Sequence, residues 1–111
     1  MPKDDLVYAG HMLDTARNAV AKLADKSQDD FDRDENLRMA LTHLIQVIGE
    51  AARRVSSDFQ SDHPEIPWSQ IIGMRHKVVH DYLHVDFDIV WGVVQSDLPS
   101  LIPELEKFVS G

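Results

Sequence analysis

The stretch from Ile71 to Tyr82 constrains this chain more than any other, because it places a charged residue inside an apolar helical face. On a helix with 100° per residue, the apolar side chains of this stretch and Leu83 fill one arc, and Arg75 falls in its middle. Arginine keeps its charge, and an unpaired buried charge costs several kcal/mol by order of magnitude. Arg75 must therefore meet a partner group, an interface or an anionic ligand. His76 and His80 lie one turn apart at the edge of the same arc, which makes this surface the candidate site.

The composition limits the class of protein. The 111 residues, 43% of them hydrophobic, suit one domain over residues 1–111. The absence of cysteine excludes disulfides, thiolate zinc sites and cysteine nucleophiles. The N-terminus lacks signal-peptide features and no apolar run approaches the roughly 20 residues that span a bilayer, so we expect a cytoplasmic protein without membrane contact. The charge of −8 and pI near 5.0 argue against non-specific nucleic-acid binding, but they leave room for a small basic cleft.

Hydrophobic periodicity predicts an all-α fold with four or five helical segments and no convincing strand. We expect helices over residues 4–24, 34–56 and 67–83, and a last helical segment from residue 87 to the C-terminus. Apolar residues at helical spacing predict the core-facing stripes of the first two helices: Leu6, Leu13, Ala16, Val20 and Leu23, then Leu37, Leu41, Leu44, Ile48, Ala51 and Val55.

The segments between these helices are expected to be irregular. The acidic stretch 27–35 is interpreted as a solvated loop. Two residues that precede proline make the stretch 57–67 a rigid connector, after which Pro67 opens the third helix. Asp86 is the predicted N-cap of the last segment. Because Pro99 and Pro103 fall inside that segment, it should be kinked or split.

A mixed face lies on the reverse of the second helix, made of Met39, His43, Gln46, Val47, Glu50 and Arg54. Two interpretations are open. Glu50 and Arg54 at four-residue spacing are most simply a surface ion pair. Met39 and Val47 have no core to face there, which favours a helix interface instead.

Three histidines could hold a divalent metal if the third helix continued past Tyr82. His76, His80 and His84 then stand at i, i+4 and i+8. The pattern is weak, because no carboxylate completes a known motif and His84 is expected in a turn. No nucleophile elbow or glycine-rich phosphate loop occurs either. We therefore expect no metal and no cofactor.

Arg75 and His80 allow a different chemistry. On one helix they are about 140° apart, so two copies of the helix across a two-fold axis would be needed to line one cleft with both groups. Such a cleft suits metal-independent RNA cleavage, with imidazoles as general base and acid and Arg stabilising the phosphorane. The alternative is that Arg75 pairs with a buried carboxylate and His80 is a hydrogen-bonded core histidine. From the residues alone, this alternative is favoured.

A family resemblance changes that balance. The sequence Arg75-His76-Lys77-Val78-Val79-His80-Asp81-Tyr82 resembles the Arg-Asn-x-x-x-His-x-Tyr signature of HepT-like toxins in the HEPN superfamily. The similarity extends over nearly the whole chain, including His63-Pro64-Glu65-Ile66-Pro67-Trp68, Gly73-Met74, Val85-Asp86, Ile89-Val90-Trp91, Asp97-Leu98-Pro99 and Ile48-Gly49-Glu50-Ala51-Ala52.

This resemblance implies a four- or five-helix bundle, a homodimer with the paired motifs at its interface, and endoribonuclease toxin activity of a type VII-like system. Arg75 would bind phosphate and His80 would be the general acid/base, with Glu50 and His76 in supporting roles. His76 replaces the Asn of the signature, either as a hydrogen-bond donor or as a second acid/base. The implied partner is a nucleotidyltransferase antitoxin that transfers AMP from ATP to Tyr82. The alternative, which the acidic charge favours, is a non-catalytic helical subunit that docks a nucleotidyltransferase and helps present its substrate.

Overall fold

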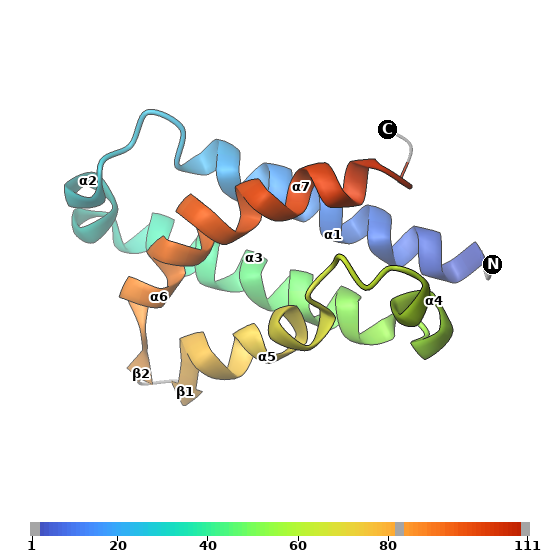
Figure 1. Ribbon diagram of the computed structural model, residues 1–111. Coiled ribbons are helices and arrows are strands. Elements are labelled where there is room, and N and C mark those ends of the chain that lie inside the picture. The colour runs from blue at the N-terminus through green and yellow to red at the C-terminus, as the bar shows by residue number, and fades with distance from the viewer. Residues whose placement is uncertain (1–2, 82–83, 110–111) are drawn as a thin grey trace.

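The fold is an all-α bundle around two long helices, as the periodicity predicts. The computed structural model describes residues 3–81 and 84–109. In it, α1 (Lys3–Lys22) and α3 (Glu35–Arg54) lie side by side and run in opposite directions (Figure 1). Helix α5 (Trp68–Val78) packs against α3, and α7 (Leu98–Glu106) packs against α1, in a bundle of 44 × 29 × 19 Å. Among the residues described, no helix is both long and apolar enough to cross a membrane.

The core between α1 and α3 follows the predicted stripes with one exception. Leu13, Ala16 and Leu23 of the first stripe are buried, whereas Leu6 is 40% exposed. Near this end of α1 it is Asp5 that points inward and is 3% exposed. Its carboxylate accepts hydrogen bonds from the Ser56 backbone N–H at 2.8 Å and the Ser56 hydroxyl at 2.7 Å. The prediction for Leu6 is therefore wrong, because a polar anchor to the end of α3 takes the inward position.

The acidic stretch 27–35 is a short helix rather than the predicted loop. Helix α2 (Gln28–Arg33) begins with a capping box, in which Ser27 and Asp30 each accept the other's backbone N–H. Phe31 is buried and lies 5.3 Å from the Trp91 ring. Charge pattern alone does not reveal this helix, since one aromatic anchor and a cap hold it in place.

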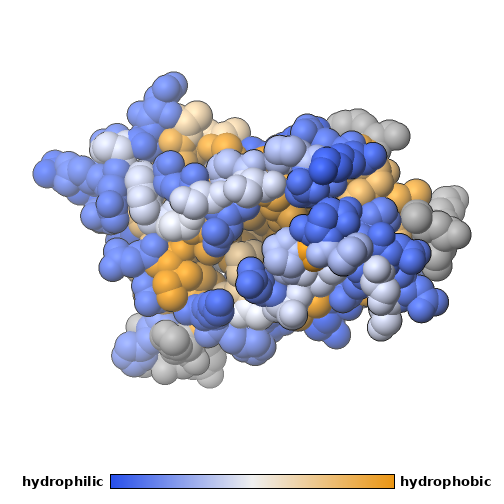
Figure 2. Space-filling view, viewed as in Figure 1, coloured by the Kyte–Doolittle hydropathy of each residue, from blue (hydrophilic) through white to orange (hydrophobic). Residues whose placement is uncertain are grey.

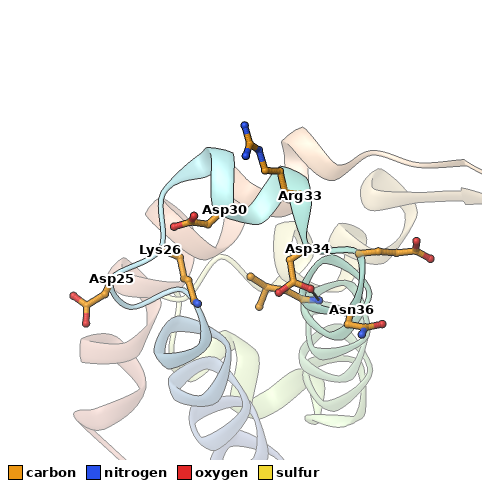
Figure 3. Close-up of a pocket in the computed structure, with 8 residues that line it drawn as sticks. Asp25, Lys26, Asp30, Arg33, Asp34 and Asn36 are labelled. Atoms are coloured by element: carbon orange, nitrogen blue, oxygen red, sulfur yellow. Dashed lines mark hydrogen bonds between the residues drawn. The ribbon is translucent and has the colours of Figure 1, made fainter.

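A polar pocket of about 680 Å³ lies at this end of the bundle, and two of its carboxylates cap helices (Figure 3). Figure 3 shows Asp25, Lys26 and Asp30 around the connection between α1 and α2, with Asp34 at the start of α3. Hydrogen bonds from Ser27 lower the pKa of Asp30. Asp34 caps α3 by accepting the Leu37 N–H at 3.0 Å. The carboxylates of Asp30 and Asp34 thus serve as helix caps.

The predicted connector 57–67 also contains a helix, α4 (Ser57–Asp62), capped by Ser56. Phe59 of α4 is buried and makes edge contacts with Trp68 and Phe108, with ring centroids 6.1 and 5.4 Å apart. Pro67 is the N-cap of α5 rather than its first residue. The rigid part of the connector is the short run 63–67, where the Trp68 indole donates to the His63 carbonyl at 2.9 Å.

Helix α5 ends five residues earlier than the predicted Leu83. After Val78 the chain forms β1 (Val79–Asp81), which pairs antiparallel with β2 (His84–Val85) in the register Val79 opposite Val85. The Asp86 N–H donates to the Val78 carbonyl at 2.8 Å and closes the hairpin. The β-branched pair Val78-Val79 favours this exchange of helix for strand, because Val79 adopts extended backbone angles. The sequence predicted no strand, and for this hairpin that prediction is wrong.

The C-terminal segment is interrupted before Pro99, as predicted, but not at Pro103, which lies inside α7. It consists of α6 (Phe87–Gly92), a π-helical turn η1 (Val93–Asp97) and α7, and Asp86 caps α6 by accepting the Ile89 N–H at 3.2 Å. The π turn precedes Pro99, which sits in the first turn of α7, where its missing N–H costs little. Between this segment and α5 runs a groove of about 620 Å³, and Figure 2 shows hydrophobic residues within it and hydrophilic ones around it.

Candidate active site

A close helix contact brings Glu50 of α3 beside Arg75 of α5. The contact occurs at Gly49, where an added Cβ would lie only 3.2 Å from the Ile71 carbonyl oxygen. This spacing allows the Arg75 Nη1 to donate to the Glu50 Oε2 at 3.4 Å. The stretch Ile48-Gly49-Glu50 and the Arg75 motif, both noted in the sequence, therefore form one site.

Arg75 is exposed rather than buried in an apolar arc. Its side chain is 43% exposed. The predicted arc included residues 79, 82 and 83, but α5 ends at Val78, and its buried positions are only Trp68, Ile71, Met74 and Val78. Arg75 lies beside this narrower stripe, so the argument from a buried charge is wrong. The predicted partner group exists, however, and it is the half-buried Glu50.

The Glu50 carboxylate accepts hydrogen bonds from three guanidinium groups. Arg53 donates to it twice, at 2.6 and 3.2 Å, Arg54 donates at 3.2 Å, and Arg75 makes the longest contact. The hydrogen bond from Arg53, with a smaller contribution from Arg54, lowers the pKa of Glu50 from its usual 4.5 to about 2. Since folding lowers this pKa, the ion pairs contribute to stability above about pH 4.5, and the contribution is lost as the pH falls through about 2. Glu50 is thus ionised wherever an imidazole titrates.

The predicted surface ion pair is confirmed, since Arg54 lies 3.2 Å from Glu50. The additional contact with Arg53 could not be told from the spacing alone, because i,i+3 and i,i+4 partners are equally close on a helix. Met39 on the same face is 49% exposed, so the predicted interface stays a prediction.

The two histidines of the motif lie on different elements. His76 is exposed on α5, whereas the backbone of His80 belongs to β1. The angle of about 140° between Arg75 and His80, derived for one helix, therefore does not apply. The backbones of His76, His80 and His84 belong to α5, β1 and β2, so the continuous helix on which the weak three-histidine pattern depended does not occur. Tyr82 lies outside the described residues.

A groove of about 560 Å³ extends from Arg75 along α3 to the N-terminal half of α1. Its walls include Arg54, Arg75 and His43 on one side and Tyr8 and His11 on the other. The sequence pattern alone does not assign the α1 residues to the site, because a polar residue on the outside of a helix carries no signal of its own. An open groove lined by guanidinium and aromatic groups is suited to a phosphate-containing ligand.

Comparisons with known proteins return a family and relatives whose descriptions name a ribonuclease. A family described as "Ribonuclease HepT-like" matches residues 12–108. The chain is 39% identical over 79 residues to "Probable ribonuclease HepT" of Thermococcus cleftensis, a match that covers 71% of this chain and 72% of that protein. It is 33% identical over 102 residues to "Putative RNase TTE0752" of Caldanaerobacter subterraneus subsp. tengcongensis, covering 92% and 88% of the two chains. No solved structure matches it significantly.

Proposed function

Because the chain belongs to the HepT-like ribonuclease family, we propose that it is an endoribonuclease toxin that cleaves RNA with Arg75 and His80. The observation that supports this most is the state of Arg75. Its guanidinium is exposed near the end of α5, and among the residues that the structure describes it is held by one 3.4 Å contact to a carboxylate that has two other partners. A phosphate can therefore bind the Arg75 guanidinium in place of Glu50, and Glu50 keeps its other two partners. His80 follows directly on the adjoining strand.

The proposed reaction needs no metal. One imidazole removes the proton of a ribose 2′-hydroxyl, the 2′-oxygen bonds to phosphorus, and the bond from phosphorus to the 5′-oxygen breaks. A second imidazole, in its protonated form, gives its proton to the leaving 5′-oxygen. Arg75 stabilises the additional negative charge on the phosphate oxygens. The products carry a 2′,3′-cyclic phosphate and a 5′-hydroxyl. The second imidazole is supplied by His80 of another copy or by His76.

The activity is tested with purified protein and single-stranded RNA in excess EDTA. Cleavage that leaves a cyclic phosphate or 3′-phosphate is expected. Complete loss of cleavage in EDTA would contradict the metal-free mechanism, and cleavage with 5′-phosphate products would contradict attack by the 2′-oxygen.

A homodimer is the proposed active form, with the two Arg75-to-Tyr82 segments meeting at a two-fold axis. The face of α3 with the exposed Met39 is the predicted helix interface, so Met39 is the position at which this arrangement can be tested. Light scattering at micromolar concentration should give about twice the chain mass of 12.6 kDa. Met39→Lys should shift the protein toward monomer.

Leu6→Lys is the matched control for the dimer, because Leu6 is a second exposed apolar residue, at 40%, on a different helix. It should leave the dimer intact. A monomeric wild-type protein would contradict the dimer, and dissociation by Leu6→Lys alone would move the interface to α1.

The proposed partner is a nucleotidyltransferase antitoxin that modifies Tyr82. The phenol oxygen attacks the α-phosphorus of ATP, pyrophosphate leaves, and the phenolic proton passes to solvent or to a base of the partner. The modified toxin carries a phosphodiester at Tyr82. Toxin and antitoxin would act in the cytoplasm, where RNA and ATP are present.

A non-catalytic binding subunit is the second candidate, because the net charge of −8 is unfavourable for a free RNA-binding enzyme. In that case the protein would bind the nucleotidyltransferase but leave RNA intact in every buffer. The cleavage assay, combined with a pull-down of the partner, separates the two functions.

A further inference from the structure

The groove between α1 and α3 extends the candidate active site, and the proposed reaction does not use this extension. It begins at Arg75, and its volume of about 560 Å³ lies in the range of small-ligand sites. We propose that this groove binds an RNA nucleotide one position beyond the two that the cleaved phosphodiester joins, with Arg54 on its phosphate and Tyr8 against its base. The proposal rests on the proposed function, since it places a third nucleotide beside the two whose phosphodiester lies at Arg75.

Charge distribution favours an anion at this place. Two guanidiniums, Arg54 and Arg75, and two carboxylates, Glu50 and Asp14, line the groove. Arg53 binds the same Glu50 carboxylate from beside the groove, so one positive charge remains unmatched there. In a chain with a net charge of −8, this local excess is the kind of small basic cleft that attracts a phosphate backbone.

Arg54 is held in a position to reach such a phosphate. Its Nε donates to Glu50 at 3.2 Å, and its Cζ lies 6.0 Å from the centre of the Tyr8 ring. Contacts with Tyr8 and Glu50 both raise the pKa of this guanidinium. A guanidinium has five N–H donors, so donors remain for phosphate oxygens after these contacts. Because two neighbours already orient the side chain, binding a phosphate costs it little additional conformational entropy.

Aromatic side chains of α1 form the opposite wall. Tyr8 is half-buried and lines the groove, and the His11 ring meets it edge-on at 6.2 Å with an interplanar angle of 81°. Single-stranded RNA is commonly bound by stacking unpaired bases on aromatic rings beside positive groups. An arginine next to a ring along one groove provides both contacts for a single nucleotide.

Binding is tested by fluorescence anisotropy with a single-stranded RNA in which 2′-O-methyl groups prevent cleavage, over a series of salt concentrations. Arg54→Gln should weaken binding and reduce the magnitude of the slope of log affinity against log salt by about 0.7, as expected for one lost phosphate contact. Tyr8→Leu should weaken binding roughly 5- to 100-fold at every salt concentration, whereas Tyr8→Phe should bind like wild type. If Tyr8→Leu loses its circular-dichroism signal, the exposed His11→Ala variant replaces it, with a smaller loss expected.

Two other arginines separate a local contact from a general charge effect. Arg53→Gln removes the same charge from the same carboxylate, but Arg53 is not among the described residues that line the groove, so its loss should be smaller. Arg33→Gln removes an exposed charge at the end of α2, just before the N-terminus of α3, and should have no effect. Equal losses for Arg53→Gln and Arg54→Gln, or wild-type affinity of Arg54→Gln and Tyr8→Leu, would overturn the proposal.

Substrate length distinguishes this proposal from the proposed function. The groove variants should cleave a dinucleotide as wild type does, and should lose activity only on longer RNA, through a raised KM. Arg75→Gln should lose activity on both substrates. If Arg75→Gln alone is impaired, the groove proposal fails and the ribonuclease remains. If wild-type protein cleaves neither substrate, the proposed function fails.

Discussion

Replacing His80 by alanine is expected to lower the rate of RNA cleavage by roughly 10²- to 10⁴-fold, the range that one general acid/base group contributes. The bundle should stay folded, because the backbone of His80 belongs to a short two-stranded hairpin and not to the long helices α1, α3 and α5. The measurement is the single-turnover rate on RNA in EDTA, with circular dichroism to verify the helical content. The pH dependence of the wild-type rate should reflect the titration of imidazole. The Glu50 carboxylate does not obscure it, because Glu50 stays ionised down to a pH far below the range in which an imidazole titrates.

His84→Ala is the matched control, since His84 is an exposed histidine on the other strand of the hairpin. It should cleave RNA like wild type. Equal cleavage by His80→Ala would mean a contaminating nuclease or a different site. Loss of activity in both variants together with EDTA sensitivity would restore the metal hypothesis. His76→Asn tests the departure from the family signature: activity should persist if His76 donates a hydrogen bond, and should fall if it is the second acid/base.

Replacing Tyr82 by phenylalanine is expected to leave the ribonuclease toxic when the nucleotidyltransferase is co-expressed, whereas wild type is silenced. The physical reason is charge. In the proposed modification, an AMP group on Tyr82 would add a phosphodiester to the motif that contains Arg75, where it would compete with the phosphate of RNA for the guanidinium. Modification would therefore stop cleavage without unfolding the protein. Colony formation with and without the partner measures the effect.

Mass spectrometry after incubation with the partner and ATP identifies the modified residue. The chain has two tyrosines, so Tyr8→Phe is the matched control and should still acquire an AMP group. Tyr82→Phe should acquire none. An unchanged adduct on Tyr82→Phe, or no adduct on wild type, would exclude this modification. Silencing of Tyr82→Phe without an adduct would show that the partner inhibits by docking.

Local signals in the sequence predicted most of the long helices. Periodic apolar residues identified α1, α3 and α5, and Asp86 was correctly expected to cap α6. The short helices α2 and α4 were missed, because each depends on a serine cap and one buried aromatic, Phe31 or Phe59. The Phe31 ring packs on Trp91 and the Phe59 ring also packs on Phe108, and such contacts between residues distant in the sequence leave no local pattern.

The sequence by itself determined the all-α class and the residue types of the candidate site, because both depend on spacings within one helix or motif. Only the tertiary structure decided where α5 ends and what Arg75 contacts. The end at Val78 depends on pairing of Val79 with Val85 across a turn, and a hairpin of this kind competes with helix extension only when it can pack. The contact of Arg75 with Glu50 joins residues 25 apart and depends on the close approach at Gly49. Such distances between helices follow from packing, which a single-helix projection does not contain.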